Sequence, residues 1–187
     1  TLVTLELSNT GITPLGVSQL ADMLSQTRIS TLDLSHNVRL GDMGAVTLFS
    51  SLSMNVYLHK LILSACSISH LGMSALAVSL ATNEALRILL LDQNHIGGEG
   101  GKTLASMLTS NQGLRVLDIN NVQLGDEGAV ALGQALALNK KLQHLFLGSN
   151  KIGDPGVRAL AKGLGTNPSL LSLSLVGNPI SNSGLEV

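Results

Sequence analysis

One leucine-spaced phrase recurs along the whole chain, and this recurrence limits the possible folds more than any other feature. The phrase, Leu-x-x-Leu-x-Leu-x-x-(Asn/Cys/Thr/Val)-x-(Ile/Leu), begins at Leu2, Ile29, Leu58, Leu86, Leu114, Leu142 and Leu170. Successive starts lie 27 to 29 residues apart, and a fixed period of this size is typical of solenoids. Because one repeat cannot bury its apolar side alone, we expect function to reside in surfaces formed by several repeats.

No linker interrupts the repeats. The 187 residues contain neither a Pro/Ser-rich stretch nor a run of charge, so we expect one domain over residues 1–187, with an incomplete seventh repeat. Thr1 begins directly on a repeat, and Val187 follows shortly after the last helix should begin. Neither end resembles the polar cap that shields the terminal core of a solenoid. We therefore expect the sequence to be a fragment of a longer protein.

Composition argues against several classes of partner. The formal net charge is -1, and no cluster of Lys and Arg occurs along the sequence, which speaks against nucleic acid or an anionic membrane as partner. Hydrophobic residues make up 44%, but no apolar run reaches the roughly 18 residues of a membrane span. The single cysteine, Cys66, cannot support a disulfide framework, and no Asn-x-Ser/Thr glycosylation acceptor with a permitted middle residue occurs. We expect a soluble, cytoplasmic protein.

The middle of each phrase predicts a short β-strand. In the repeat that begins at Leu86, Leu89 and Leu91 alternate with Ile88 and Leu90. This two-residue period sends neighbouring side chains to opposite faces of a strand. We expect Leu89 and Leu91 to face the core, and Ile88 and Leu90 to face outward.

A bend and a helix follow each predicted strand. Gly97 and Gly98 permit a tight bend, and Leu104 and Leu108 lie one helical turn apart. We expect an aspartate at the bend to cap its own helix, and an asparagine near the helix end to stop it in the left-handed conformation. The aspartates are Asp42, Asp126 and Asp154, and the asparagines are Asn55, Asn83, Asn111, Asn139 and Asn167.

Different spacings of strands and helices predict a curved molecule. Strands stack about 4.8 Å apart and helices about 8 to 10 Å apart. We therefore expect a right-handed α/β solenoid shaped as a horseshoe, with parallel strands on the concave face and helices on the convex face.

The repeat from Leu142, with Asn150 at the ninth position and Ile152-Gly153-Asp154 after it, resembles the ribonuclease-inhibitor type of leucine-rich repeat. The resemblance covers all seven repeats. It implies the fold but leaves the partner open, because this type also occurs in nucleotide-binding immune receptors, actin-filament regulators and activating proteins of the small GTPase Ran.

The ninth position of the phrase predicts a hydrogen-bonded ladder. An Asn side chain there can bond backbone groups left open where a strand ends. The residues are Thr10, Asn37, Cys66, Asn94, Val122, Asn150 and Asn178. We interpret Cys66 as a small buried substitute for Asn and not as a nucleophile, because the pattern brings no cation near it to lower its pKa.

The third, fifth and seventh positions face the hollow of the horseshoe. Glu6 and Asp33 should lie side by side at one end, with Lys60 next along. In the middle we expect one apolar patch, formed by Ile62, Ile88, Leu90, Val116 and Phe146. The core does not need these outward side chains, so the patch predicts a partner site, although the preference of Ile and Val for strands is an alternative explanation. Polar residues expected to orient the partner are Glu6, Asp33, Asp92, Asp118, Asn120 and His144.

We do not expect an enzyme, a cofactor or a metal site. We interpret Glu6 and Asp33 first as solvated charges, second as a seat for a partner's cation and last as a catalytic pair. The five histidines do not cluster. Asp118, His144 and Ser149 could meet, but no nucleophile elbow accompanies them.

The second repeat has one residue more than the others in its loop, which should bring Arg39 to the rim. An arginine there could contact a partner or stabilise phosphoryl transfer, but a harmless loop insertion is the favoured interpretation. The sequence therefore predicts a non-catalytic module that binds a partner protein through its concave face. The alternatives are a GTPase-activating module that uses Arg39 and a structural spacer in a larger arc.

Overall fold

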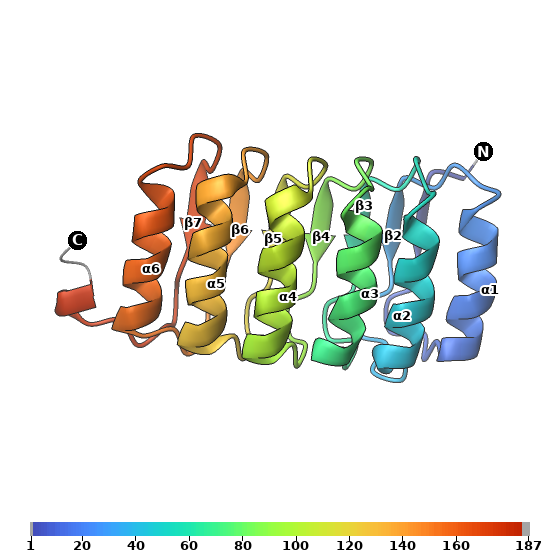
Figure 1. Ribbon diagram of the computed structural model, residues 1–187. Coiled ribbons are helices and arrows are strands. Elements are labelled where there is room, and N and C mark those ends of the chain that lie inside the picture. The colour runs from blue at the N-terminus through green and yellow to red at the C-terminus, as the bar shows by residue number, and fades with distance from the viewer. Residues whose placement is uncertain (1, 185–187) are drawn as a thin grey trace.

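The computed structural model describes residues 2–184, in which short strands and helices alternate (Figure 1). The strands are β1 (Thr4–Glu6), β2 (Thr31–Asp33), β3 (Lys60–Ile62), β4 (Ile88–Leu90), β5 (Val116–Asp118), β6 (His144–Phe146) and β7 (Ser172–Ser174). The helices are α1 (Pro14–Leu24), α2 (Gly41–Leu52), α3 (His70–Leu80), α4 (Gly97–Ser110), α5 (Gly125–Leu138) and α6 (Asp154–Leu164), and a 3-10 turn, η1 (Asn182–Gly184), follows. The expectations for Thr1 and for residues 185–187 lie outside the described residues.

All strands belong to one parallel sheet in chain order, from β1 to β7. The middle leucine of each strand pairs with the middle leucine of the next, as Leu61 does with Leu89 and Leu89 with Leu117. Figure 1 shows the helices side by side in one layer, with the strands in a second layer behind them. The predicted solenoid is confirmed, with the sheet on the concave wall and the helices on the convex wall.

The core lies between these two layers. Leu89 and Leu91 are fully buried, as are Leu104 and Leu108 on the facing helix. Ile88 remains partly exposed on the other face of its strand. The predicted sorting of alternate strand residues is therefore correct.

The asparagine ladder is present. Asn94 Nδ2 donates to the backbone oxygens of Leu63 and Leu91, both at 2.8 Å. Its Oδ1 accepts from the backbone N–H groups of Cys66 and Ile68 in the preceding repeat. Each such amide thus joins two repeats and supplies partners for backbone groups that would otherwise be buried and unpaired. Asn37, Asn150 and Asn178 bond in the same way.

The expected left-handed asparagines at the helix ends are wrong. Asn111 and Asn139 have φ of -65° and -70° with ψ of 128° and 130°, which is extended backbone. The side chain of Asn111 ends α4 differently: Oδ1 accepts from Leu114 N at 2.7 Å, and Nδ2 donates to the oxygen of Leu80 in the preceding repeat. The amide group, and not an unusual φ, is therefore what the position requires.

The expected role of the aspartates is also wrong. Leu124, not Asp126, is the N-cap residue of α5. Asp126 Oδ1 instead accepts from the backbone N–H groups of Gly153 and Gly156, at the start of α6. Asp42 likewise accepts backbone N–H groups at the start of α3, and Asp154 accepts one from Ser181. These carboxylates cap the next repeat, because parallel stacking brings the following helix start beside them.

Within residues 2–184, no helix combines the length and the apolar character needed to cross a membrane.

Candidate interaction surface

Four members of the apolar patch lie directly beside one another on the concave wall. Ile62 pairs with Leu90 across β3 and β4, and Ile88 pairs with Val116 across β4 and β5. All four side chains are partly exposed, while the leucines on the opposite face of the same strands are fully buried. The sheet thus presents a continuous apolar surface over its three central strands.

Phe146, the fifth member, is separated from Leu90 by one strand of the sheet. The register places Asp118 between Leu90 and Phe146, so Phe146 adjoins Val116 only on the diagonal. Asp118 Oδ1 accepts a hydrogen bond from the backbone of Asn120 at 2.9 Å. Burial, and secondarily the charge of Asp92, raise the pKa of the Asp118 carboxyl, against the opposing effect of the Asn120 hydrogen bond. The patch therefore has a half-buried acid inside it, flanked by apolar side chains.

The acidic pair lies where the sequence predicts. Glu6 and Asp33 are direct partners across β1 and β2. Asp33 Oδ1 accepts from both the backbone N–H and the hydroxyl of Ser35, at 2.8 and 2.6 Å. Lys60 pairs with Thr31 and so lies on the diagonal from Asp33. Over residues 2–184 the ion pairs are those of Lys102, so these three charges are not paired with one another.

Of the remaining polar residues, Asp92 and Asn120 are held by hydrogen bonds. The Asp92 carboxylate accepts from the hydroxyl of Ser64, and Asn120 Oδ1 accepts from the backbone N–H of Gly148. His144 pairs with Val116 and lies diagonally from Asp118. In the described part of the chain no hydrogen bond joins Asp118 to His144, so a catalytic triad is not assembled.

Arg39 is exposed in the enlarged loop of the second repeat. Leu40 N donates to Asn37 O at 2.9 Å and closes this loop as a turn, with Val38 also exposed at its tip. Among the described residues, Arg39 has no ion pair. Its side chain is free to contact another molecule.

Sequence reasoning missed one group of charges, Arg87 and Arg115, which we call the arginine pair. The two residues are 28 positions apart, so they form no cluster in the sequence, but both occupy the second position of the phrase. Arg115 N donates to Arg87 O at 2.8 Å where β4 and β5 begin. The repeat period could have predicted this pair, because residues at the same position of successive repeats become neighbours in the solenoid.

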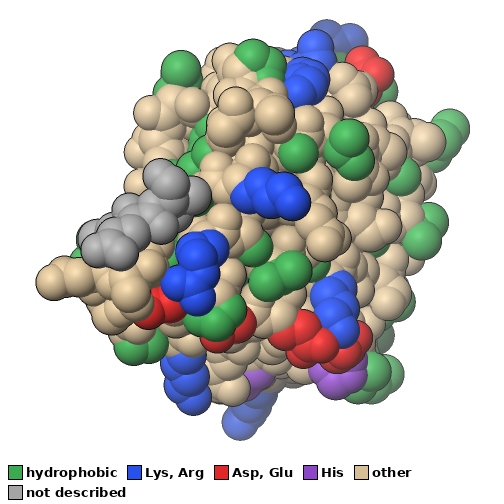
Figure 2. Space-filling model, turned by 60° about the vertical axis from the view of Figure 1, so that its left-hand side comes forward, with side chains coloured by type: hydrophobic (Ala, Val, Ile, Leu, Met, Phe, Trp, Pro, Cys, Tyr) green, Lys and Arg blue, Asp and Glu red, His purple; other side chains and the backbone are tan. Residues whose placement is uncertain are grey.

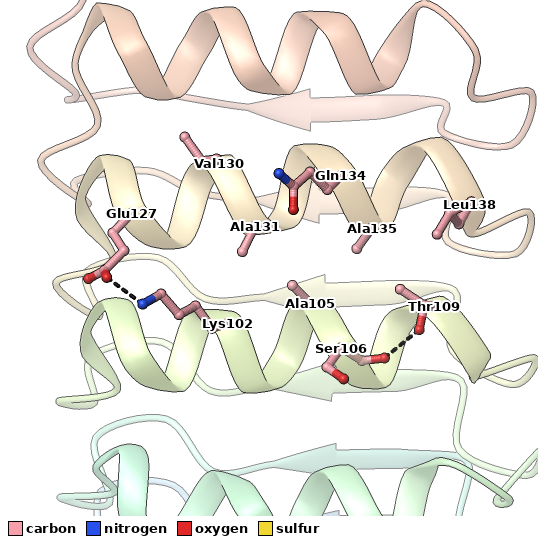
Figure 3. A pocket seen from close by; sticks show the side chains of 10 residues that line it. All are labelled: Lys102, Ala105, Ser106, Thr109, Glu127, Val130, Ala131, Gln134, Ala135 and Leu138. Carbon is pink, nitrogen blue, oxygen red and sulfur yellow. Dashed lines mark hydrogen bonds and ion pairs between the residues drawn. The ribbon is translucent and has the colours of Figure 1, made fainter.

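The convex face contains a hollow of about 600 Å³ between α4 and α5 (Figure 3). Figure 3 shows Ala105, Ala131 and Ala135 facing this hollow, with Lys102 and Glu127 as an ion pair at one end. Hydrogen bonds from Lys102 to Glu127 and to Glu99 raise the pKa of Lys102. A lysine held in its charged form is neither a nucleophile nor a base.

Charges of both signs are spread over the end of the molecule seen in Figure 2, with hydrophobic side chains scattered between them. Cys66 is buried, and its burial raises the pKa of the thiol from 9.0 to about 11. Within residues 2–184, no group of His, Cys, Asp and Glu has the arrangement to hold a metal ion.

Comparison with known families identifies the chain. A family model for the leucine-rich repeat matches residues 1–21, 28–49, 82–105, 110–133, 138–161 and 166–187, which is more than half of the sequence. The chain belongs to the leucine-rich repeat family. Of the leucine-rich repeats predicted here, only the third lies largely outside the matched segments, and it is the one with Cys66 at the ninth position.

Solved structures share the fold of this leucine-rich repeat domain. The tropomodulin C-terminal domain of Caenorhabditis elegans superposes with a TM-score of 0.64 at 17% sequence identity, over 80% of this chain and 92% of that one. A structure described as leiomodin-1 actin-binding site 2 superposes with a TM-score of 0.63 at 19% identity, over 81% of this chain and 88% of that one. The comparison with curated proteins gave no match.

Proposed function

We propose that this leucine-rich repeat domain is a non-catalytic module that binds a partner protein through its concave face, with the apolar patch as the anchor. The observation that carries the proposal is the contrast within β4. Leu89 and Leu91 already fill the core and are fully buried, yet Ile88 and Leu90 on the opposite face are partly exposed apolar side chains. Folding does not require them there, and contiguous exposed apolar surface tends to mark interaction sites.

The patch can supply enough free energy to anchor a partner. Covering 100 Å² of apolar surface contributes roughly 2.5 kcal/mol before the costs of association are counted. Ile62, Leu90, Ile88 and Val116 adjoin one another in register, so one partner side chain can cover several of them.

The polar residues around the patch set the orientation of the partner. Asp33, Asp92 and Asn120 are already held by hydrogen bonds to neighbouring residues. Side chains that are fixed before binding lose little further freedom on association. Glu6, Lys60 and His144 complete this polar surround, and Asp118 lies within the patch between Leu90 and Phe146.

The similar structures support the class of function. One of them is described as an actin-binding site of leiomodin-1, so a fold of this kind can carry a protein-binding surface. At 19% identity this likeness does not identify the partner of the present chain.

Catalysis is not part of the proposal. The wall is open, the carboxylates of Asp33, Asp92 and Asp118 accept hydrogen bonds from serine or backbone groups, and the buried Cys66 thiol is protonated at neutral pH. A cytoplasmic location, and the lack of nucleic acid or membrane binding, stay predictions from the sequence.

The test is a concave double variant, Ile88→Asp with Phe146→Asp, against a convex control, Leu71→Asp with Val78→Asp, at two exposed positions of α3. Each protein is used for affinity capture from the source cell, and captured proteins are identified by mass spectrometry. We expect the wild type and the control to retain the same partner, and the concave variant to lose it with nearly unchanged circular dichroism and melting. A partner retained by the concave variant would contradict the proposal.

GTPase activation through Arg39 is tested separately. GTP hydrolysis by a panel of small GTPases is measured with the wild type and with Arg39→Ala. We expect no acceleration by either protein. Acceleration by the wild type that the variant loses would favour the GTPase-activating alternative, and a chain that captures no partner at all would favour the structural spacer.

A further inference from the structure

The arginine pair lies where β4 and β5 begin, directly before two residues of the apolar patch. Arg87 precedes Ile88 on β4 and Arg115 precedes Val116 on β5. One Nη of each guanidinium donates to the same acceptor, the backbone oxygen of Gly113, at 2.9 Å from Arg87 and 2.6 Å from Arg115. Two cations are thus held together by one neutral carbonyl group.

No carboxylate neutralises this pair within the described residues. The ion pairs over residues 2–184 involve only Lys102. Glu84, whose backbone lies against Gly113, is exposed and pairs with neither arginine. Burial, and then the charge of Arg87, lower the pKa of Arg115, which is the sign expected for a cation beside a like charge.

Both guanidiniums keep free donors. A guanidinium has five N–H donors in a planar fork. Within residues 2–184, neither Arg87 nor Arg115 uses its Nε or its second Nη in a hydrogen bond. Because the contact with Gly113 leaves these donors unused, each arginine can still receive a carboxylate in the two-pronged geometry that this side chain favours.

We infer that Arg87 and Arg115 form an anion seat for an Asp or Glu side chain of the protein partner that docks on the apolar patch. This inference rests on the proposed function, since it assigns chemistry to the same partner. Arg87 directly precedes Ile88 and Arg115 directly precedes Val116, so the seat adjoins the patch where β4 and β5 begin, and the partner carries its acidic residue next to its apolar anchor.

A protein carboxylate fits the surroundings better than a nucleic acid does. Carboxylates lie toward the other end of the same two strands, with Asp118 as the last residue of β5 and Asp92 two residues beyond β4, and these repel a long polyanion. Aromatic residues make up only 2% of the chain, which leaves few surfaces on which bases can stack. A single acidic side chain beside apolar ones contacts the cations and avoids the acids.

The test uses a displayed library of random peptides of about 16 residues, selected on the wild-type chain. The seat variant is Arg87→Gln with Arg115→Gln. The control, Lys151→Gln with Arg158→Gln, removes the same charge at exposed positions away from the pair. We expect selected peptides to combine apolar residues with Asp or Glu, and to bind the seat variant about tenfold more weakly than wild type or control. Replacing the acidic residue of a peptide by its amide should cause the same loss, and should make binding insensitive to the seat variant.

Failure of the seat is distinct from failure of the proposed function. Peptides that the Ile88→Asp and Phe146→Asp variant loses, but that carry no excess of acidic residues and bind the seat variant normally, overturn the seat alone. Peptides insensitive to the patch variant, or no binding peptides at all, overturn both. A fluorescent oligothymidine that binds the wild type at physiological salt, and loses binding on the seat variant, overturns the choice of a protein ligand.

Discussion

Asp126, in the first turn of α5, accepts a hydrogen bond through Oδ1 from the backbone N–H of Gly156, at the start of α6, at 3.0 Å. The same oxygen accepts from Gly153 N at 2.8 Å. The first turn of a helix has backbone N–H groups without partners inside the helix, and a carboxylate there also interacts favourably with the helix dipole. Each such aspartate therefore couples the folding of one repeat to the next.

Replacing Asp126 by alanine should destabilise the start of α6 more than α5 itself. Loss of a capping side chain costs about 1 kcal/mol, and at most about 2 kcal/mol. Urea unfolding would measure the total loss, and amide hydrogen exchange should speed up at Gly153 and Gly156. Gln134→Ala, at an exposed position of α5, is the control and should change little. Faster exchange confined to α5 would show that Asp126 caps its own helix after all.

A second prediction concerns the contact between α5 and α6. A methyl group on Gly163 would clash with the backbone oxygen of Gly133, and neither helix can accommodate it without moving. Gly163→Ala should therefore cost about 1 to 3 kcal/mol of unfolding free energy, as expected for overpacking. Thermal and urea unfolding would measure the loss.

Gly165→Ala is the matched control. Gly165 ends α6 with φ of -55°, and an added methyl group there would meet nothing closer than 3.5 Å. This substitution should be neutral or slightly stabilising. Equal effects of the two substitutions would mean that the close approach of the helices is not what requires glycine at position 163.

A third prediction follows from the buried thiol of Cys66. Its pKa is raised from 9.0 to about 11, chiefly by burial. In the unfolded chain the thiol loses its proton near pH 9, whereas the folded chain retains it, so ionisation favours unfolding. This destabilising effect of ionisation is absent below pH 9, and the free energy of unfolding should fall as the pH rises from about 9 to about 11.

Comparison with Cys66→Ala isolates this effect. The variant loses packing at every pH, but it has no thiol to ionise. The difference in melting temperature between wild type and variant should therefore shrink between pH 8 and pH 11. A constant difference would indicate that the thiol titrates normally in the folded chain. Labelling with a thiol reagent at pH 8 should be slow in the folded protein and fast in denaturant.

The site was predictable from the sequence in part. The alternation around Leu89 identified Ile88 and Leu90 as outward residues, and the register then aligned Ile62 with Leu90. Alternation within one repeat says nothing about neighbours in other repeats. The position of Asp118 between Leu90 and Phe146 follows only when the repeats are aligned with one another. Hydrogen-bond partners were harder to predict from the sequence, because the aspartate at each bend could bond either its own helix or the next.

The sequence by itself determined the repeat, the strand faces and the buried leucines, because these follow from local periods of two residues and one helical turn. Only the tertiary structure decided which groups meet across repeats. Stacking assigned Asp126 to α6, gave the Asn111 amide its partners in two repeats, and brought Arg87 beside Arg115 on one carbonyl oxygen. These contacts depend on how far each coil of the solenoid is offset from the next. The sequence of a single repeat does not specify this offset.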